Sequence, residues 1–371
     1  MIRAFLFFLL WQSASAEVLP GLARFDLYSG ALANRRVGLV VNQASVFHGQ
    51  HAIELLQAHG VHLVKLYGLE HGVRGEGGAG QPIGDGVDPP SGLPVVSLYG
   101  PRRKPDPASL AGIDVLVFDI QDVGTRFFTY ISSLGLILEA AAENHLPVVV
   151  LDRPNPNADY TDGPVLKAGL HSFVGAYPIP VVYGLTIGEL ARMIAGEGWQ
   201  HTAGLRMQVV PLGGYDRSVV EAPEGRPSPG LRSLNAIRAY PWLTLFEPTN
   251  VSLGRGTEHP YEIFGRPGRG LGDFSFVPAR GTSSEPPLYI GQECFGTEFF
   301  SRPALQVPRF TTDFFSAAAP KVTDPQFLQL LVGDKAVTAQ MIQGVPWAKI
   351  RAGLEAELRD FTLRRRPYLL Y

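Results

Sequence analysis

Residues 68–80, with the sequence GLEHGVRGEGGAG, place a carboxylate and an imidazole, Glu70 and His71, directly before a run of glycines. A glutamate at the end of a strand can act as a general acid, and a flexible loop beside it can fold over a substrate. The last six residues also match the dinucleotide-binding spacing G-x-G-x-x-G. That spacing needs a helix after it, and the ten residues after Gly80 include five prolines or glycines, which argues against one. A general acid beneath a loop and a glycine-rich surface loop without a ligand both remain open.

Polar and charged side chains gather at the end of the apolar run 114–120. They are Asp119, Gln121, Asp122 and Arg126. Clusters of this composition bind hydroxyl-rich ligands such as sugars. The structural alternative is that one of the aspartates caps the next helix or pairs with Arg126.

Two further segments carry side chains suited to a substrate. Residues 152–157, DRPNPN, form a stiff loop in which Asn155 can either complete a backbone turn or face a ligand. Residues 246–262 are glycine-rich and lack lysine, which favours a loop that contributes to a site over a solvated one. This second segment offers Glu247, Asn250, Arg255 and Glu262, and Arg255 can present its guanidinium to a substrate carboxylate.

The sequence predicts neither a metal nor an organic cofactor. His59 ends a predicted helix and His62 enters a predicted strand, so the two imidazoles diverge and do not match a zinc helix motif. Carboxylates elsewhere could still hold a hard ion. No G-x-S-x-G nucleophile motif occurs in the chain. A formal net charge of -2 gives no reason to expect nucleic acid as a partner.

Short, almost continuously apolar runs alternate with helical patterns as far as about residue 215. Runs of this kind are typical of parallel strands covered on both faces, and they predict an α/β fold with a mostly parallel sheet. The predicted helices cover 51–59, 129–144 and 186–197, and the last begins with a capping box of Thr186 and Glu189. The predicted strands cover 37–42, 61–67, 94–99, 114–120, 147–152, 180–183 and 205–211. Ligands of such sheets bind beyond the carboxyl ends of the strands, where Glu70, Asp119 and Asn155 fall.

The chain of 371 residues is long enough for two domains after an export signal. Residues 1–16 have a basic start, an apolar stretch and an A-x-A cleavage signal, as in a secretory signal peptide. We expect a periplasmic or secreted protein without stable membrane insertion after cleavage, and with only one cysteine, Cys294, it has no internal disulfide. The expected domains are 17–220, with the parallel sheet, and a smaller α+β domain at 221–371, with helices after Pro325 and at 345–360.

Four motifs in the same order resemble those of the bacterial exo-β-N-acetylmuramidase family. They are LEHGVRG at 69–75, FDIQDVGTRFFTY at 118–130, LDRPNPN at 151–157 and LFEPTNVSLGRGT at 245–257. The resemblance runs from about residue 37 to the C-terminus. It implies a Rossmann-like N-terminal domain, a smaller C-terminal domain and an active-site cleft between them. It also implies hydrolysis of terminal, non-reducing N-acetylmuramic acid from peptidoglycan-derived disaccharides or muropeptides.

The family's proposed acid/base glutamate falls on Glu70. For the second catalytic group we name Glu262 and Asp122, while the acetamido group of the substrate could take that role instead. Arg126 or Arg255 suits the lactyl carboxylate of the sugar better than Arg74 does. The remaining residues that we expect to bind substrate are His71, Asp119, Gln121, Tyr130, Asn155, Glu247 and Asn250.

This chain departs from the family pattern at three places. Leu69 stands where the family usually has proline, Pro248 where it has glycine, and Gly230 where it has asparagine. The last two put the exact specificity in question more than the class of reaction. The alternative to an enzyme is a non-catalytic periplasmic protein that binds sugars or wall fragments, since two α/β lobes around a polar cleft also describe such proteins.

Overall fold

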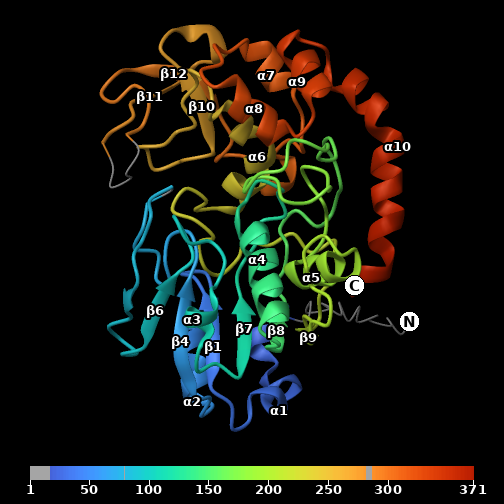
Figure 1. Ribbon diagram of the computed structural model, residues 1–371. Coiled ribbons are helices and arrows are strands. Elements are labelled where there is room, and N and C mark those ends of the chain that lie inside the picture. Colours follow the sequence, from blue (N-terminus) through green and yellow to red (C-terminus); the bar gives the residue numbers. More distant parts are fainter. Residues whose placement is uncertain (1–16, 79, 281–285) are drawn as a thin grey trace, which may run out of the picture.

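The computed structural model describes residues 17–78, 80–280 and 286–371, so the predicted signal peptide lies outside it. A seven-stranded sheet forms the first part of the molecule, in the spatial order β5-β6-β4-β1-β7-β8-β9 (Figure 1). Neighbouring strands are parallel, apart from the edge strand β5, which runs antiparallel to β6. The strands are β1 (Val37–Val41), β4 (Leu63–Gly68), β5 (Gly86–Val87), β6 (Pro94–Ser97), β7 (Val115–Asp119), β8 (Val148–Leu151) and β9 (Met207–Val210).

Alternation along the strands divides the core into two layers, one on each face of the sheet. Leu39 and Val117 belong to the apolar cluster beneath α1 and α2, while Val40 and Phe118 belong to the cluster beneath α3, α4 and α5. Both faces are therefore buried, as the continuous apolar runs predicted. The helices are α1 (Ser29–Leu32), α2 (Ala52–Ala58), α3 (Pro107–Leu110), α4 (Tyr130–Glu143) and α5 (Ile187–Gly196).

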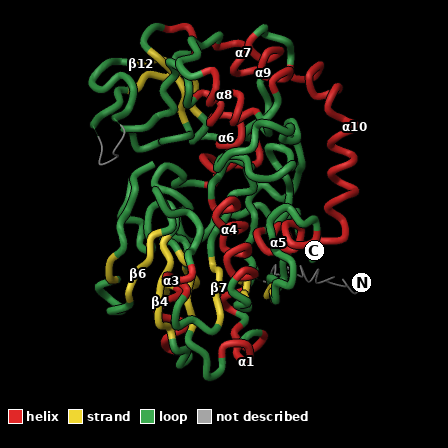
Figure 2. Tube along the Cα trace, in the orientation of Figure 1, coloured by secondary structure: helices red, strands yellow, loops and turns green. Residues whose placement is uncertain are grey.

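The structure confirms the predicted parallel sheet and the capping box at the start of α5. Thr186 accepts a hydrogen bond from the amide of Glu189, whose carboxylate accepts one from the amide of Thr186. The predicted strand at 180–183 is wrong. Val182 makes only isolated bridges, to Thr125 and Asp162, because the segment lies in a buried connection rather than in the sheet. Figure 2 shows this connection as part of the long loop region between β8 and α5. Its apolar run reflects burial, which periodicity alone does not distinguish from a strand.

The second part of the molecule is α+β, as predicted. A three-stranded antiparallel sheet has the order β10-β12-β11. The strands are β10 (Ile263–Arg266), β11 (Phe274–Phe276) and β12 (Cys294–Glu298), and the helices are α6 (Leu234–Leu243), α7 (Asp313–Ala318), α8 (Pro325–Val332), α9 (Lys335–Ile342) and α10 (Trp347–Arg365). A small ribbon, β2 (Val46–Phe47) with β3 (Gln50–His51), precedes α2 in the first part. Short 3-10 turns cover Gly21–Ala23, Phe25–Leu27, Thr244–Phe246, Arg269–Leu271, Ala304–Gln306 and Arg366–Tyr368.

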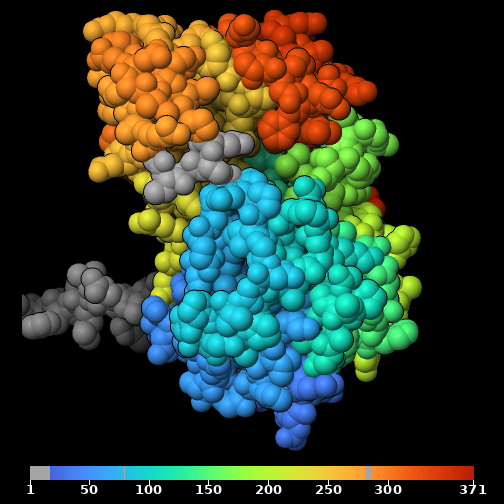
Figure 3. Space-filling model, turned by 60° about the vertical axis from the view of Figure 1, so that its left-hand side comes forward, coloured from blue at the N-terminus to red at the C-terminus, as the bar shows by residue number. Residues whose placement is uncertain are grey.

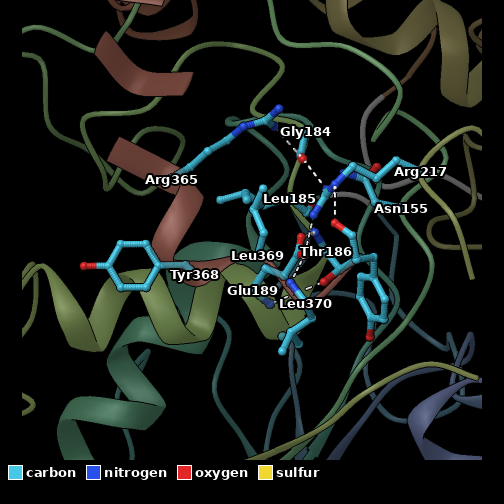
Figure 4. A network of polar contacts seen from close by, with 12 residues as sticks. Asn155, Gly184, Leu185, Thr186, Glu189, Arg217, Arg365, Tyr368, Leu369 and Leu370 are labelled. Atoms are coloured by element: carbon cyan, nitrogen blue, oxygen red, sulfur yellow. Dashed lines mark hydrogen bonds and ion pairs between the residues drawn. The ribbon is translucent and has the colours of Figure 1, made fainter. Parts of the chain in front are cut away.

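The two parts share one apolar cluster and are joined again by the end of the chain. The cluster above α4 continues into α6, α8 and α10, and α10 runs back along the molecule so that the C-terminus meets α5 (Figure 1). There the hydroxyl of Tyr371 donates to Asp152 at 2.8 Å, and the amide of Leu370 donates to Glu189 at 2.7 Å. Figure 4 shows Glu189 and Leu370 in this network, together with Arg217. The predicted boundary after residue 220 falls between β9 and α6 and stays a prediction.

Within the part of the chain that the structure describes, no helix has both the length and the apolar character needed to cross a bilayer.

Candidate active site

A cavity of about 600 Å³ lies where the two parts of the molecule meet. Figure 3 shows the first part, coloured blue to green, against the second, coloured orange to red. From the first part the cavity is lined by Glu70, His71, Gly80, Tyr99, Phe127, Phe128, Thr129 and Val174. From the second part it is lined by Ser228, Gly230, Tyr240, Glu247, Pro248, Thr249, Val251, Ser252, Leu253, Arg255, Tyr261, Pro286, Pro287, Leu288, Thr323, Asp324 and Phe327.

Glu70 reaches this cavity because it lies just beyond the carboxyl end of β4, next to the centre of the sheet. Both of its carboxylate oxygens accept hydrogen bonds. Oε1 accepts from the hydroxyl of Tyr99 and from the amide of Gly80, each at 3.0 Å, and Oε2 accepts from the hydroxyl of Thr129 at 2.7 Å. The carboxylate is therefore held in one orientation while it remains partly accessible from the cavity.

The backbone around Glu70 is fixed from behind. The hydroxyl of Tyr130 donates to the Glu70 carbonyl and to the Pro227 carbonyl, each at 3.2 Å, so it supports the site without lining the cavity. His71 adopts a left-handed φ of 73° and donates from Nδ1 to the Gly77 carbonyl at 3.0 Å. Burial lowers the pKa of His71, so a neutral imidazole with Nε2 as its acceptor is favoured at neutral pH.

The glycine-rich segment folds back on Glu70 and His71. The amide of Gly80 and the carbonyl of Gly77 supply two of the contacts just described. The guanidinium of Arg74, within the same segment, donates hydrogen bonds to the carboxylates of Glu54 and Asp88 at 2.6 to 3.0 Å. These contacts hold the segment against α2 and the residues after β5. Among the described residues, the next regular element after β4 is the strand β5, so the dinucleotide spacing is not followed by a helix whose N-terminus could bind a pyrophosphate.

Across the cavity, Glu247 forms a compact group with Arg255 and Tyr261. Oε1 of Glu247 accepts from Nη2 of Arg255 at 3.0 Å and from the hydroxyl of Tyr261, to which the same Nη2 donates at 2.7 Å. Tyr261 has φ 60°, which is uncommon for a bulky residue, and its amide is held by the Leu253 carbonyl at 2.8 Å. The strained backbone turns the phenol towards Glu247.

Aromatic rings line the cavity between these two groups. The ring of Tyr240, on α6, contacts Phe127, Phe128 and Tyr261 at centroid distances of 5.6, 5.8 and 5.2 Å. Burial raises the pKa of Tyr240, and the negative charges of Glu247 and Glu70 raise it further. Tyr240, Glu70 and Glu247 all line this one cavity.

Four predicted site residues, Glu70, His71, Glu247 and Arg255, are brought together in the cavity. The other predicted site residues from the first part point into the protein interior and do not line the cavity. Asp119 is fully buried, and both of its oxygens accept from Arg153, at 2.6 and 2.8 Å. Asp122 is buried and accepts from the hydroxyl of Tyr183. Asp119 therefore has a structural partner, but this is Arg153 rather than the expected Arg126. Neither aspartate caps α4, whose N-cap is Thr129.

Arg126, Gln121 and Asn155 also lie outside the cavity lining. The guanidinium of Arg126 is fully buried and donates to the carbonyls of Pro164, Ile179, Leu331 and Val332. Gln121 donates to backbone carbonyls at 2.7 Å, and Asn155 donates to the Leu185 carbonyl at 2.7 Å. These side chains hold loops together, so the geometry favours Arg255 over Arg126 as the ligand of a substrate carboxylate.

Glu262 and Asn250, from the second part, also lie outside the cavity lining. Glu262 is buried behind the cavity wall, where it bonds to Ser233 and His259. The side chain of Asn250 accepts from the amide of Lys321 at 2.8 Å and ties two loops together. Neither of the residues named for the second catalytic role, Glu262 and Asp122, lines the cavity.

Sequence reasoning missed Tyr99, Thr129, Tyr240 and Tyr261 as cavity residues. Thr129 lies within the motif at 118–130, next to Tyr130, and this position is the one signal that the sequence offers. Of the three departures from the family pattern, Leu69 is buried in the core, while Gly230 and Pro248 line the cavity. A Cβ at Gly230 would lie 3.0 Å from the Tyr261 ring, so glycine here leaves that ring its space.

Across residues 17–78, 80–280 and 286–371, no three His, Cys, Asp or Glu side chains are grouped so that they could hold a metal ion.

Comparison with known proteins gives a consistent picture along the chain. The family model described as "Exo-beta-N-acetylmuramidase NamZ, N-terminal" matches residues 37–235, and its C-terminal counterpart matches residues 238–371. The peptidoglycan beta-N-acetylmuramidase NamZ of Bacillus subtilis (strain 168) is 34% identical, over 93% of this chain and 89% of the relative. Two crystal structures of DUF1343 family proteins from Bacteroides fragilis NCTC 9343 are similar, with TM-scores of 0.86 and 0.82 and identities of 32% and 29%. They cover 96% and 95% of this chain, and 99% of each neighbour is covered in turn.

Proposed function

The chain belongs to the exo-β-N-acetylmuramidase NamZ family and hydrolyses terminal N-acetylmuramic acid from peptidoglycan fragments, and we propose that Glu70 donates the proton that releases the leaving sugar. It is therefore a glycoside hydrolase rather than a sugar-binding protein without turnover. The observation that carries the proposal is the Glu70 carboxylate, which lines the cavity and is oriented by three hydrogen-bond donors.

Hydrolysis of a glycoside needs a proton on the oxygen that leaves with the aglycone. Oε1 of Glu70 already accepts two hydrogen bonds and Oε2 accepts one, so Oε2 is the oxygen that carries the transferable proton. Thr129 can continue to donate to the remaining lone pair of Oε2. Tyr99 and Gly80 then stabilise the carboxylate left on Glu70 after the transfer.

Arg255 recognises the lactyl carboxylate of the muramic acid in this proposal. It is the arginine in the cavity lining, and only Nη2 takes part in its hydrogen bonds within the described residues. The rest of the guanidinium can bind a carboxylate. The rings of Tyr240 and Phe128 offer apolar surface to the sugar, and either a disaccharide or a muropeptide would supply the terminal residue.

Export to the periplasm or the medium completes the proposal. Its basis is the sequence of residues 1–16, and the substrate occurs outside the cytoplasmic membrane. N-terminal sequencing of the protein recovered from a periplasmic or culture fraction should begin at Glu17. A mature protein that still begins at Met1 in the cytosolic fraction would contradict the proposed location.

The catalytic role of Glu70 is tested with Glu70→Gln and two substrates. Loss of general acid catalysis costs roughly 10²- to 10⁴-fold in rate, so the variant should lose that much activity on a muramic-acid-terminated disaccharide. In an aryl glycoside of an acidic phenol, the phenolate can leave without being protonated. The same variant should therefore lose far less activity on this substrate. Glu355→Gln, on the exposed face of α10, is the matched control. Equal losses on both substrates, or no loss, would refute the role of Glu70.

A further inference from the structure

A glycosidase needs a second group that faces the positive charge developing on the sugar, and the cavity narrows the choice of that group. Among the described residues that line it, the carboxylates are Glu70, Glu247 and Asp324. Asp324 is exposed at the start of α8, where it accepts from the amide of Phe327 at 2.9 Å as a helix cap. Glu247 is the carboxylate that remains.

We propose that Glu247 is the second catalytic carboxylate, with Tyr261 and Arg255 as the residues that position it. This inference rests on the proposed function, because it takes Glu70 as the proton donor. Glu247 lies within the 246–262 segment but was expected only to bind substrate. Its placement in the cavity, where Asp122 and Glu262 are not found, assigns it the larger role.

The contacts of Glu247 engage one oxygen and leave the other for the substrate. Arg255 and Tyr261 both donate to Oε1, and within the described residues no hydrogen bond engages Oε2. The Glu247 side chain is 24% exposed, and it reaches the cavity while its carboxylate stays fixed. A group held by two donors on one side meets the geometric demand of a catalytic carboxylate, because its free oxygen loses little entropy on reaching the substrate.

Glu247 and Glu70 also come from opposite walls of the cavity. Glu70 follows β4 in the first part, whereas Glu247 follows the 3-10 turn Thr244–Phe246 in the second. Both side chains line the same cavity, so the two carboxylates face a shared space. A sugar bound there would have one carboxylate at its leaving oxygen and the other at its anomeric carbon.

The step is balanced without any other reactant. The bond between C1 and the glycosidic oxygen breaks, and that oxygen takes the electron pair together with the proton of Glu70. The charge that develops on C1 and the ring oxygen faces Oε2 of Glu247, on the side opposite the leaving oxygen. Water then adds to C1 as the new hydroxyl group and gives its other proton to the Glu70 carboxylate, which restores the acid for the next turnover.

Azide rescue of Glu247→Ala tests the assignment. Removing the carboxylate should lower kcat by about 10²- to 10⁴-fold, judged from the usual size of such contributions. Azide can enter the vacated space and attack C1 directly, so sodium azide should restore turnover of the aryl β-glycoside. The product should be the α-configured azide of N-acetylmuramic acid, because attack comes from the side opposite the leaving group. A binding residue would give neither rescue nor this product.

Two further variants keep the result interpretable. Glu247→Gln is isosteric and can still accept from Arg255 and Tyr261, so it should fold as the wild type does and lose kcat with little change in KM. Glu355→Gln, on the exposed face of α10 and outside this cavity, is again the matched control and should retain near wild-type activity. A large rise in KM with kcat unchanged in Glu247→Gln, or no azide adduct with Glu247→Ala, would overturn the inference. The role of Glu70 would still stand if Glu70→Gln behaved as predicted, so the two proposals fail separately.

Discussion

Arg126, which follows β7, donates a hydrogen bond from Nη2 to the carbonyl of Val332, in the last turn of α8, at 2.8 Å. The two residues are 206 positions apart in the chain and belong to the two parts of the molecule. The same nitrogen also bonds to Leu331, so a buried cation satisfies carbonyls that the end of a helix leaves without partners. This contact joins the two parts of the molecule.

We predict that Arg126→Met destabilises the protein by about 3 to 5 kcal/mol, because four buried carbonyls lose their donor. Methionine keeps much of the volume and none of the hydrogen bonds. Urea unfolding measures the change in free energy. The activity per folded molecule should stay near that of the wild type, whereas a variant of normal stability with a raised KM would return Arg126 to the substrate site.

Gly333, directly after α8, provides a finer test of the same contact. A Cβ there would lie 2.3 Å from Nη2 of Arg126, and the residue has φ 78°. Gly344 has a similar φ of 74° but nothing within 4 Å of its Cβ position. Gly344→Ala should therefore report the backbone strain alone, about 1 kcal/mol. Gly333→Ala should lower the free energy of unfolding by at least twice as much. Equal losses in the two variants would show that Arg126 can move away from the new Cβ without a loss of stability.

The position of a residue can be predicted from the sequence when its partners lie nearby in the chain, and not when they lie on distant segments. The capping box of Thr186 and Glu189 is local, so its pattern was sufficient. The position of Glu70 followed from the rule for parallel sheets, which needs only the strand. Arg126 could not be placed, because its carbonyl partners lie on distant segments and nothing in the sequence marks them. Glu247 was found as a polar residue, but its pairing with Tyr261 depends on a left-handed backbone that propensity does not predict.

The buried carboxyl group of Asp122 predicts a pH dependence of stability. Burial raises its pKa to about 6, and Oδ1 has no hydrogen-bond partner within the described residues. A carboxyl group whose pKa is higher in the folded state than in the unfolded state stabilises the protein when the pH is low. This contribution is complete at a pH below the unfolded-state pKa, near 3.8, and is lost as the pH rises through the folded-state pKa, about 6. Relative to Asp122→Asn, which does not titrate, the wild type should lose about 2 kcal/mol between pH 4.5 and pH 7.5.

Urea unfolding of both proteins at the two pH values measures that difference. Because Asp122 lies outside the cavity, the asparagine variant should keep most of its activity at pH 7. A pH-independent difference in stability would show that the carboxyl group is ionised throughout. A loss of turnover of 10²-fold or more in a folded variant would restore Asp122 as a catalytic group.

Thr129 is the residue whose removal should separate orientation from binding at Glu70. Its hydroxyl donates to Oε2, the oxygen to which we assign the transferable proton, and Thr129→Val removes that donor with almost no change in shape. Glu70 would then be held only through Oε1, so the acid should sample unproductive orientations. We expect kcat on the natural disaccharide to fall about 10-fold, with KM changed less than 2-fold, as for loss of one hydrogen bond to a charged group.

Thr129→Ser keeps the hydroxyl and should retain most of the activity. On the aryl glycoside, which needs no proton, the valine variant should approach the wild type, and an equal loss on both substrates would mean that Thr129 acts through substrate binding instead.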